Sequence, residues 1–239
     1  MITRTLRQQA GRILTPSREK LALQEAFSRF TGDFMTRKAS QGGIAQEGEK
    51  REVTVMFTDL RDFTALSETL PPHDLVKLLN EHFQMSVEVI TANGGYVNKF
   101  IGDAVLAVFG APDRNPWHSL DAVKAALALR KAVAESNAQR KAAGQSVIRM
   151  GIGLHAGDVI AGVIGSRARA EFTVIGDAVN VASRLESMTK ERKVDLLLSE
   201  PVARALDASF GARELEPAQV RGRVEPVRVY TIDTAEVKE

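Results

Sequence analysis

The 239-residue sequence contains no cysteine and only 4 histidines. Without cysteine the chain can form neither disulfides nor thiolate metal sites, which is typical of a protein from a reducing compartment. The histidines show no ligand spacing such as His-x-x-x-His, so a zinc enzyme is not expected. A net charge of +2 is too small to indicate nucleic acid as a partner.

Long apolar runs are also missing from the sequence. No stretch approaches the length of a membrane span, and no signal-peptide pattern opens the chain. We therefore expect a cytoplasmic location, or the cytosolic part of a membrane-anchored protein in which a sensor or membrane domain precedes Met1. The 44% of hydrophobic and 26% of charged residues suit a globular domain with an appendage.

The composition changes along the chain and predicts three regions. Residues 1–50 begin with a basic stretch, continue with helical apolar spacing from Leu21 to Phe34, and end in a polar, glycine-bearing linker. The basic stretch predicts a solvated helix face, with an interdomain signalling helix or a membrane-proximal segment as alternatives. Residues 51–232 form the expected folded domain, and residues 233–239 form a short tail.

The pattern of the middle region predicts an α+β fold. A β-branched strand at 52–60 is followed by an amphipathic helix at 71–95, which begins with prolines and ends with glycines. "YVNKF" and "AVLAVFG" predict a hairpin, and a long helix at 117–143, further strands and a helix at 177–191 follow it. This order is the split βαββαβ arrangement of ferredoxin-like folds, with extra C-terminal strands and helices.

Two aspartates stand at the ends of predicted strands. Asp59 lies where the first strand ends, and Asp103 lies in the Gly-Asp turn of the hairpin. Because the hairpin of a βαββ unit pairs beside the first strand, the carboxylates could meet at one end of the sheet. There they would repel each other unless a cation such as Mg²⁺ or Mn²⁺ lay between them. The alternative is two unrelated surface aspartates, with Asp103 shaping the turn beside a solvated Lys99.

The segment after Asp59 predicts an anion site. "LRDFT" leads into a short helical segment, whose free backbone N–H groups at Phe63 and Thr64 would face the same end of the sheet. A metal pair beside an anion-binding turn suggests phosphoryl or nucleotidyl transfer.

Asn180 and Arg184 form a second polar pair. They are four positions apart on the predicted helix 177–191, so they share one helix face. An amide beside a fixed cation could hold a ribose and a pentacoordinate phosphate. The alternative is an ordinary surface helix with Arg184 near Glu186. Asp177 is expected to be structural, as an N-cap or a first-turn acid.

Three sequence blocks carry a family resemblance. "VTVMFTDLRDFTALSE", "GGYVNKFIGDAVLAVFG" and "AEFTVIGDAVNVASRLE" resemble class III nucleotidyl cyclase catalytic domains in order and spacing, over roughly residues 50–232. The resemblance implies a lyase, an adenylyl cyclase that converts ATP to 3′,5′-cyclic AMP and pyrophosphate for intracellular signalling. It also implies two Mg²⁺ or Mn²⁺ ions per active site, and a head-to-tail homodimer with two shared active sites.

The resemblance gives roles to five positions at the metal and the base. Asp59 and Asp103 match the metal-binding aspartates, and the Leu60 carbonyl would be an additional ligand. Lys99 matches the purine-contacting position, where lysine goes with adenine and glutamate with guanine. Thr173 matches the second purine-selecting position, where many relatives have aspartate and where threonine marks a subgroup of bacterial-type adenylyl cyclases.

Further positions match the sugar and the phosphates. By resemblance, Asn180 would orient the ribose, and Arg184 would stabilise charge on the α-phosphate. Arg221 in "QVRGRVEPV" is the candidate for the terminal phosphates, although many relatives have lysine there. Asp62 stands where many members have glycine, and little consequence is expected because the backbone would face the phosphates. In the implied dimer, the metal aspartates of one chain would meet the purine-selecting and Asn/Arg residues of the other.

Three other interpretations compete with an adenylyl cyclase. A guanylyl cyclase of the same fold is disfavoured, because the ammonium of Lys99 cannot accept a hydrogen bond from guanine N1–H. A catalytically inactive regulatory module should have lost a metal aspartate or the Asn/Arg pair, and this chain retains both. A polymerase-palm relative needs a Gly-Gly-acid-acid-Phe hairpin, which residues 100–103 do not supply.

Overall fold

A computed structural model describes residues 21–23, 26, 28, 34–37, 48–166, 168–219 and 226–233. Contacts divide the chain into two compact units. One comprises the described residues of Met1–Glu47 with Gly162–Phe172, and the other comprises those of Gly48–Ala161 and Thr173–Glu239. Among the described residues, no helix combines the length and the apolar character that a membrane span requires.

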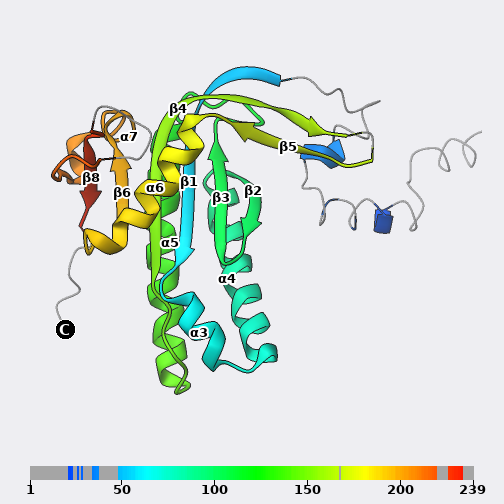
Figure 1. The fold of residues 1–239 in the computed structure, drawn as a ribbon, viewed down its shortest axis with the longest axis vertical. Coiled ribbons are helices and arrows are strands. Elements are labelled where there is room, and N and C mark those ends of the chain that lie inside the picture. Colours follow the sequence, from blue (N-terminus) through cyan, green and yellow to red (C-terminus); the bar gives the residue numbers. More distant parts are fainter. Residues whose placement is uncertain are drawn as a thin grey trace, which may run out of the picture. The chain divides into compact units, whose positions relative to one another are not determined.

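The larger unit is built on a mixed sheet (Figure 1). Along the sheet the strands follow the order β2-β3-β1-β4-β6-β8-β7, and β5 pairs with β4. The first four positions, β2-β3-β1-β4, are the strand order of a βαββαβ ferredoxin-like core, and the other strands extend it. The predicted fold class is therefore confirmed. The strands are β1 Gly48–Leu60, β2 Tyr96–Ile101, β3 Ala104–Phe109, β4 Met150–Gly165, β5 Ala170–Ile175, β6 Leu196–Ser199, β7 Ala212–Glu214 and β8 Val229–Ile232.

The helices begin and end where the sequence chemistry indicates. Helix α4 has proline in its first turn and ends before Gly94, whose φ of 76° is left-handed and favours glycine. Asp177 lies in the first turn of α6, as predicted. The helices are α3 Phe63–Thr69, α4 Pro72–Ala92, α5 His118–Ala142, α6 Asp177–Glu191 and α7 Glu200–Ala203, with a 3-10 turn at Ala208–Phe210.

Helices cover both faces of the sheet. In β6, Leu196 and Leu198 pack into the core that α4 and α5 cover, whereas Leu197 packs into the core under α6. Successive strand residues point to opposite faces, so α6 lies on the face opposite to α4 and α5. Figure 1 shows the same arrangement, with α6 in front of the sheet and α5 behind it.

Helix α6 lies directly against the backbone of β4. A Cβ atom at Gly153 would collide with the backbone of Ala182 and Glu186, and a Cβ atom at Gly151 would collide with the Glu186 side chain. Position 153 therefore requires glycine for this close approach, whereas a side chain at position 151 would first displace the Glu186 carboxylate. At Gly153 the strand backbone therefore limits how closely α6 can approach the sheet.

Two element boundaries differ from the sequence-based expectation. The first strand begins at Gly48, so residues 48–50 of the expected linker belong to β1. The strands expected within residues 147–165 form one continuous strand, β4. Of the expected N-terminal helix, the described residues are helical, while Phe27 and Phe30 lie outside the described residues. The domain limits at 51 and 232 stay predictions.

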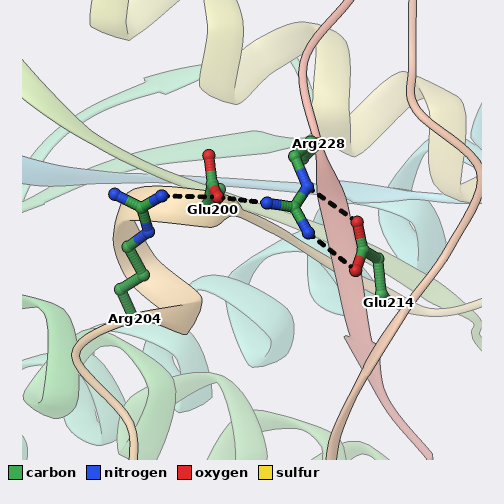
Figure 2. Close-up of polar contacts among 4 residues, drawn as sticks. All are labelled: Glu200, Arg204, Glu214 and Arg228. Atoms are coloured by element: carbon green, nitrogen blue, oxygen red, sulfur yellow. Dashed lines mark hydrogen bonds and ion pairs between the residues drawn. The ribbon is translucent and has the colours of Figure 1, made fainter.

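A network of ion pairs closes the far edge of the sheet (Figure 2). Arg228 donates through Nε and Nη2 to the two carboxylate oxygens of Glu214, at 2.8 and 2.9 Å. Its Nη1 atom donates to Glu200 at 2.7 Å, and Arg204 donates to the same carboxylate at 2.8 Å. Glu200 and Glu214 therefore each have a guanidinium partner.

Candidate active site

The fold brings Asp59 and Asp103 together. The register that pairs Thr58 with Val105 places the β2–β3 turn beside the end of β1. In that turn Gly102 has a left-handed φ of 64°, and Asp103 follows it. The backbone N–H of Leu60 donates to Asp103 Oδ2 at 3.2 Å, and Asp103 is close enough to Asp59 to raise its pKa. The structure therefore links these carboxylates, as their positions in the sequence suggested.

The electrostatics of this pair are unfavourable to negative charge. The pKa of Asp59 is raised to about 7, mainly by burial and in addition by the neighbouring Asp103 carboxyl group and the charge of Glu186. A hydrogen bond from Leu60 opposes the shift. Asp59 Oδ1 is buried and has no hydrogen-bond partner among the described residues. A single proton or a cation would relieve this repulsion.

The donor atoms at this end of the sheet fit a divalent cation. Two carboxylates and the Leu60 carbonyl are hard oxygen ligands, which Mg²⁺ and Mn²⁺ prefer. Within the described part of the chain, no three His, Cys, Asp or Glu side chains cluster closely enough to hold an ion. The remaining ligands would therefore come from water or from substrate phosphates, as is usual for Mg²⁺.

The turn after β1 carries an unusual residue, Asp62. Its φ of 59° is left-handed, a conformation that favours glycine, and it forms the N-cap of α3. Its carboxylate pairs with Arg149 and with Lys190, each at 2.7 Å. Phe63 and Thr64 follow in the first turn of α3, where Phe63 packs against the core and Thr64 is exposed.

Lys99 lies on β2 directly after a bulge. The register shifts between Val97 and Lys99, which places Lys99 opposite Leu106 of β3 and leaves Asn98 as the extra residue. Asn98 Oδ1 accepts a hydrogen bond from Thr173 Oγ1 at 3.3 Å, and Thr173 is only 8% exposed. Strands β2 and β5 are therefore joined next to Lys99. Thr173 thus contacts the residue that precedes Lys99.

Asn180 and Arg184 both lie on α6, one turn apart on the same side. Asn180 is exposed and Arg184 is half-buried. Because α6 rests on the backbone of β4, these two side chains start from a fixed position. Arg221, the expected contact for the terminal phosphates, lies outside the described residues.

Two residues near the site escaped the sequence-based prediction. Asn98 is the polar residue that precedes Lys99 on β2. Its hydrogen bond with Thr173 depends on a β-bulge that the sequence pattern does not predict. Glu186 is 9% exposed, and burial is the main cause of its raised pKa. It could have been found as an acid in the apolar stripe that includes Ala182 and Leu185.

Known proteins resemble this chain in sequence. Adenylate cyclase 1 of Rhizobium meliloti (strain 1021) is 33% identical over 208 residues, a match that covers 86% of this chain and 31% of the relative. The chain thus spans less than half the length of the curated relatives it matches.

Solved structures resemble it in fold. The adenylyl cyclase CyaB from P. aeruginosa superposes with a TM-score of 0.73 and 29% identity, covering 80% of this chain and 98% of that one. The guanylyl cyclase Cya2 gives a TM-score of 0.68 and 34% identity, with 77% and 92% covered. A guanylyl cyclase domain from Blastocladiella emersonii, described as a non-canonical dimer, gives 0.64 and 27%, with 76% and 96% covered.

A family profile covers most of the sequence. The profile of the adenylate and guanylate cyclase catalytic domain matches residues 45–234, which include every candidate site residue above. The match extends from the start of β1 past β8, so the family accounts for the whole sheet. The chain belongs to the adenylate and guanylate cyclase catalytic domain family.

Proposed function

We propose that this chain is an adenylyl cyclase domain, which converts ATP to 3′,5′-cyclic AMP and pyrophosphate. Family membership establishes the class of protein, and the choice of ATP over GTP is the proposal. The Rhizobium relative is named an adenylate cyclase, but the similar structures include both adenylyl and guanylyl cyclases. Overall similarity therefore leaves the nucleotide open, and the residues expected at the base have to distinguish the two.

The observation that carries the proposal is the position of Lys99 beside the Asn98–Thr173 hydrogen bond. An ammonium group only donates, so Lys99 can serve adenine N1, an acceptor, but not guanine N1–H, a donor. The Thr173 hydroxyl donates to Asn98, and its oxygen keeps lone pairs that can accept from the adenine amino group. Guanine has a carbonyl oxygen where adenine has its amino group, so this oxygen and the Thr173 oxygen would be two acceptors facing each other. Both side chains favour adenine.

The metal-binding role falls to the aspartate pair. Asp59 and Asp103 would hold the cations with the Leu60 carbonyl, since these oxygens lie together and their mutual repulsion favours a cation between them. Mg²⁺ or Mn²⁺ ions held there would lower the pKa of the ribose 3′-hydroxyl and neutralise the triphosphate.

Other residues would position the substrate. The backbone N–H groups of Phe63 and Thr64, in the first turn of α3, would donate to phosphate oxygens. Asn180 would orient the ribose, and Arg184 would stabilise the charge that develops on the α-phosphate. Arg221 is proposed for the terminal phosphates.

We also propose that two chains share two active sites. The aspartates of one chain would face the base-selecting and phosphate-binding residues of the other, as the resemblance implies. Phe100 and Ile101, next to the Gly102 turn, support an interface there because they are apolar yet 47% and 49% exposed. The Blastocladiella domain is also dimeric, in an arrangement described as non-canonical.

A direct assay tests the nucleotide. The purified chain is incubated with Mn²⁺ and either ATP or GTP, and the cyclic product is identified by chromatography. We expect cyclic AMP to form with a much higher kcat/KM than cyclic GMP. A preference for GTP would contradict the proposal and support a guanylyl cyclase, a candidate that the 34% identity to Cya2 favours.

A further inference from the structure

The peptide unit that joins Leu60 to Arg61 has a fixed orientation. The N–H of Arg61 donates to the carbonyl oxygen of Arg149 at 2.8 Å, and Arg149 directly precedes β4. The unit is trans, so its C=O and N–H groups point in opposite directions. Because β1 lies between β3 and β4, the Leu60 carbonyl points to the β3 side, where Asp103 accepts from the Leu60 N–H. The hydrogen bond to Arg149 therefore sets the direction of a proposed metal ligand.

Arg149 contacts the same turn a second time, through its side chain. Its Nη2 atom donates to Asp62 Oδ2 at 2.7 Å. The other oxygen of this carboxylate, Oδ1, accepts from Lys190 Nζ at 2.7 Å, and Lys190 lies in the last turn of α6. The Asp62 carboxylate therefore joins the turn after β1 to the start of β4 and to the end of α6.

These contacts offset the strain of the Asp62 backbone. A left-handed φ of 59° is unfavourable for most residues, although aspartate tolerates it better than others. The side chains of Asp62, Arg149 and Lys190 are all exposed, and exposed ion pairs contribute little to overall stability. A glycine at position 62 would adopt the turn without strain, but it would leave Arg149 without this partner. We therefore look for the effect of the carboxylate in the local position of the turn rather than in the stability of the fold.

We propose that Asp62 is a positioning residue for the metal site, which acts through Arg149 on the carbonyl of Leu60. This inference rests on the proposed function, in which that carbonyl and the two aspartates hold the cation. The ion pair with Asp62 restrains Arg149, and the Arg149 carbonyl in turn restrains the peptide unit between Leu60 and Arg61. Lys190 holds the Asp62 carboxylate from its other oxygen.

Mn²⁺ binding to the full chain without nucleotide tests the proposal, with free Mn²⁺ read by electron paramagnetic resonance. Charge and positioning predict opposite results for Arg149→Gln. Removal of a positive charge beside the site should by itself strengthen cation binding. Loss of positioning should weaken it, and we expect a dissociation constant about threefold higher, the factor that an exposed ion pair accounts for. Equal or tighter binding by Arg149→Gln would overturn the proposal.

Two variants of Asp62 separate the carboxylate from the backbone strain. Asp62→Gly removes the ion pairs and the strain, whereas Asp62→Ala removes the ion pairs and keeps the strain. Both should weaken Mn²⁺ binding about fivefold, because both lose two ion pairs. Weakening in Asp62→Ala alone would assign the effect to strain and overturn the proposal.

The matched control is Arg213→Gln. Arg213 forms an exposed ion pair with Asp233 at 3.0 Å, on the strand at the far edge of the sheet. Mn²⁺ binding should be unchanged in this variant. A weakening equal to that of Arg149→Gln would show a general effect of lost surface charge and would overturn the proposal. Melting temperatures establish that each variant is folded.

Hydrogen exchange at the Arg61 amide tests the same contact without metal or substrate. Its bond to Arg149 protects this N–H, so NMR should show exchange about threefold faster in Arg149→Gln and unchanged in Arg213→Gln. Unchanged exchange in Arg149→Gln would overturn the positioning role. If the unmodified chain binds no Mn²⁺, the proposed metal site fails and this role fails with it, even where the exchange responds as expected. The two failures are therefore distinguishable.

Discussion

Carboxylates at the β7–β8 edge of the sheet and at the end of β1 lie in opposite electrostatic environments. At the edge formed by β7 and β8, hydrogen bonds from Arg228 hold the pKa of Glu214 below its ordinary value, and Glu200 lies between two arginines (Figure 2). At the end of β1, burial and a second acid raise the pKa of Asp59 to about 7. The edge neutralises its charges within the chain, whereas the β1 end leaves them to be neutralised from outside.

This difference separates structural acids from functional ones. A compensated surface carboxylate contributes modestly to stability and can be lost without consequence for a distant reaction. An uncompensated, half-buried carboxylate lowers stability and is retained where a ligand needs it. The predictions below test this distinction, from the largest expected effect to the smallest.

Replacing either aspartate should remove nearly all activity. Asp59→Ala or Asp103→Ala deletes a cation ligand, and loss of metal-based charge stabilisation of several kcal/mol lowers kcat by about 1000-fold or more. The melting temperature without metal should stay the same or rise, because the repulsion disappears. Activity is measured in saturating Mg²⁺ and unfolding by calorimetry. A variant with near-normal turnover would show that its carboxylate binds no essential cation.

In the proposed dimer, a second chain would complete the active site at the end of β1. Mixing two inactive variants tests this. Asp59→Ala and Asn180→Ala homodimers should each be nearly inactive. In a mixed dimer one site has both groups, and random exchange makes about half the dimers mixed, so activity should recover to about a quarter of the unmodified level. Dilution should reduce the recovery.

The mixing experiment has its own control. Subunit exchange is demonstrated with two differently tagged chains before activity is read. If exchange occurs and no activity returns, Asp59 and Asn180 act within one chain, and the shared-site proposal is wrong.

Changing the residue expected at the base should change nucleotide use. Lys99→Glu places a carboxylate against the adenine N1 acceptor, a mismatch of about 2–4 kcal/mol, so kcat/KM for ATP should fall by about 30-fold to 1000-fold. Combining it with Thr173→Ala should permit some use of GTP, because the hydroxyl that opposes guanine is gone. Unchanged ATP turnover in Lys99→Glu would mean that Lys99 does not contact the base.

The raised pKa of Asp59 predicts a pH dependence of stability in the absence of metal. The folded chain binds a proton at Asp59 that the unfolded chain, with an ordinary pKa of 3.8, has released, so the contribution of Asp59 to stability should fall as pH rises from about 4 to about 7. Partial exposure screens the effect, and we expect about 1–2 kcal/mol. The slope is read from melting temperatures in EDTA. The contribution of Asp59 is the difference in slope between the unmodified chain and Asp59→Asn, since the shifted pKa values of Glu186 and His82 add slopes of their own. It should be smaller with Mg²⁺ present.

The compensated edge should show the smallest effect. Glu214→Ala removes one partner of Arg228, so the melting temperature should fall slightly at low salt and by less at high salt. Cyclase activity should not change, in contrast to the aspartate variants. A loss of activity in a stable Glu214→Ala chain would break the proposed distinction between the two ends.

Local patterns predicted most of the fold. Sequence patterns predicted the ends of α4, the Gly-Asp turn of the hairpin and the position of α6, because each depends on residues close together in sequence. These patterns also predicted the strand order of the core, which places Asp59 beside Asp103. That the two aspartates bind metal stays a prediction.

Features that depend on contacts between residues far apart in the sequence could not be predicted from it. The pairing of Asp62 with Arg149 and Lys190 joins three separate elements, so no local pattern announces it. The Asn98–Thr173 contact likewise depends on how β5 returns beside β2. The left-handed φ of Asp62 gives a physical reason for the glycine that resemblance led us to expect there.

A glycine of β4 has a consequence for how this protein can change over time. Since Gly153 lets the backbone of α6 rest on the strand, no side chain at this point could be exchanged to shift the helix by small steps. Substitutions elsewhere on the outer surface can accumulate while Asn180 and Arg184 keep their place. Divergence at Gly153, by contrast, would displace both side chains together, so inheritance of the site depends on a residue that never touches a substrate.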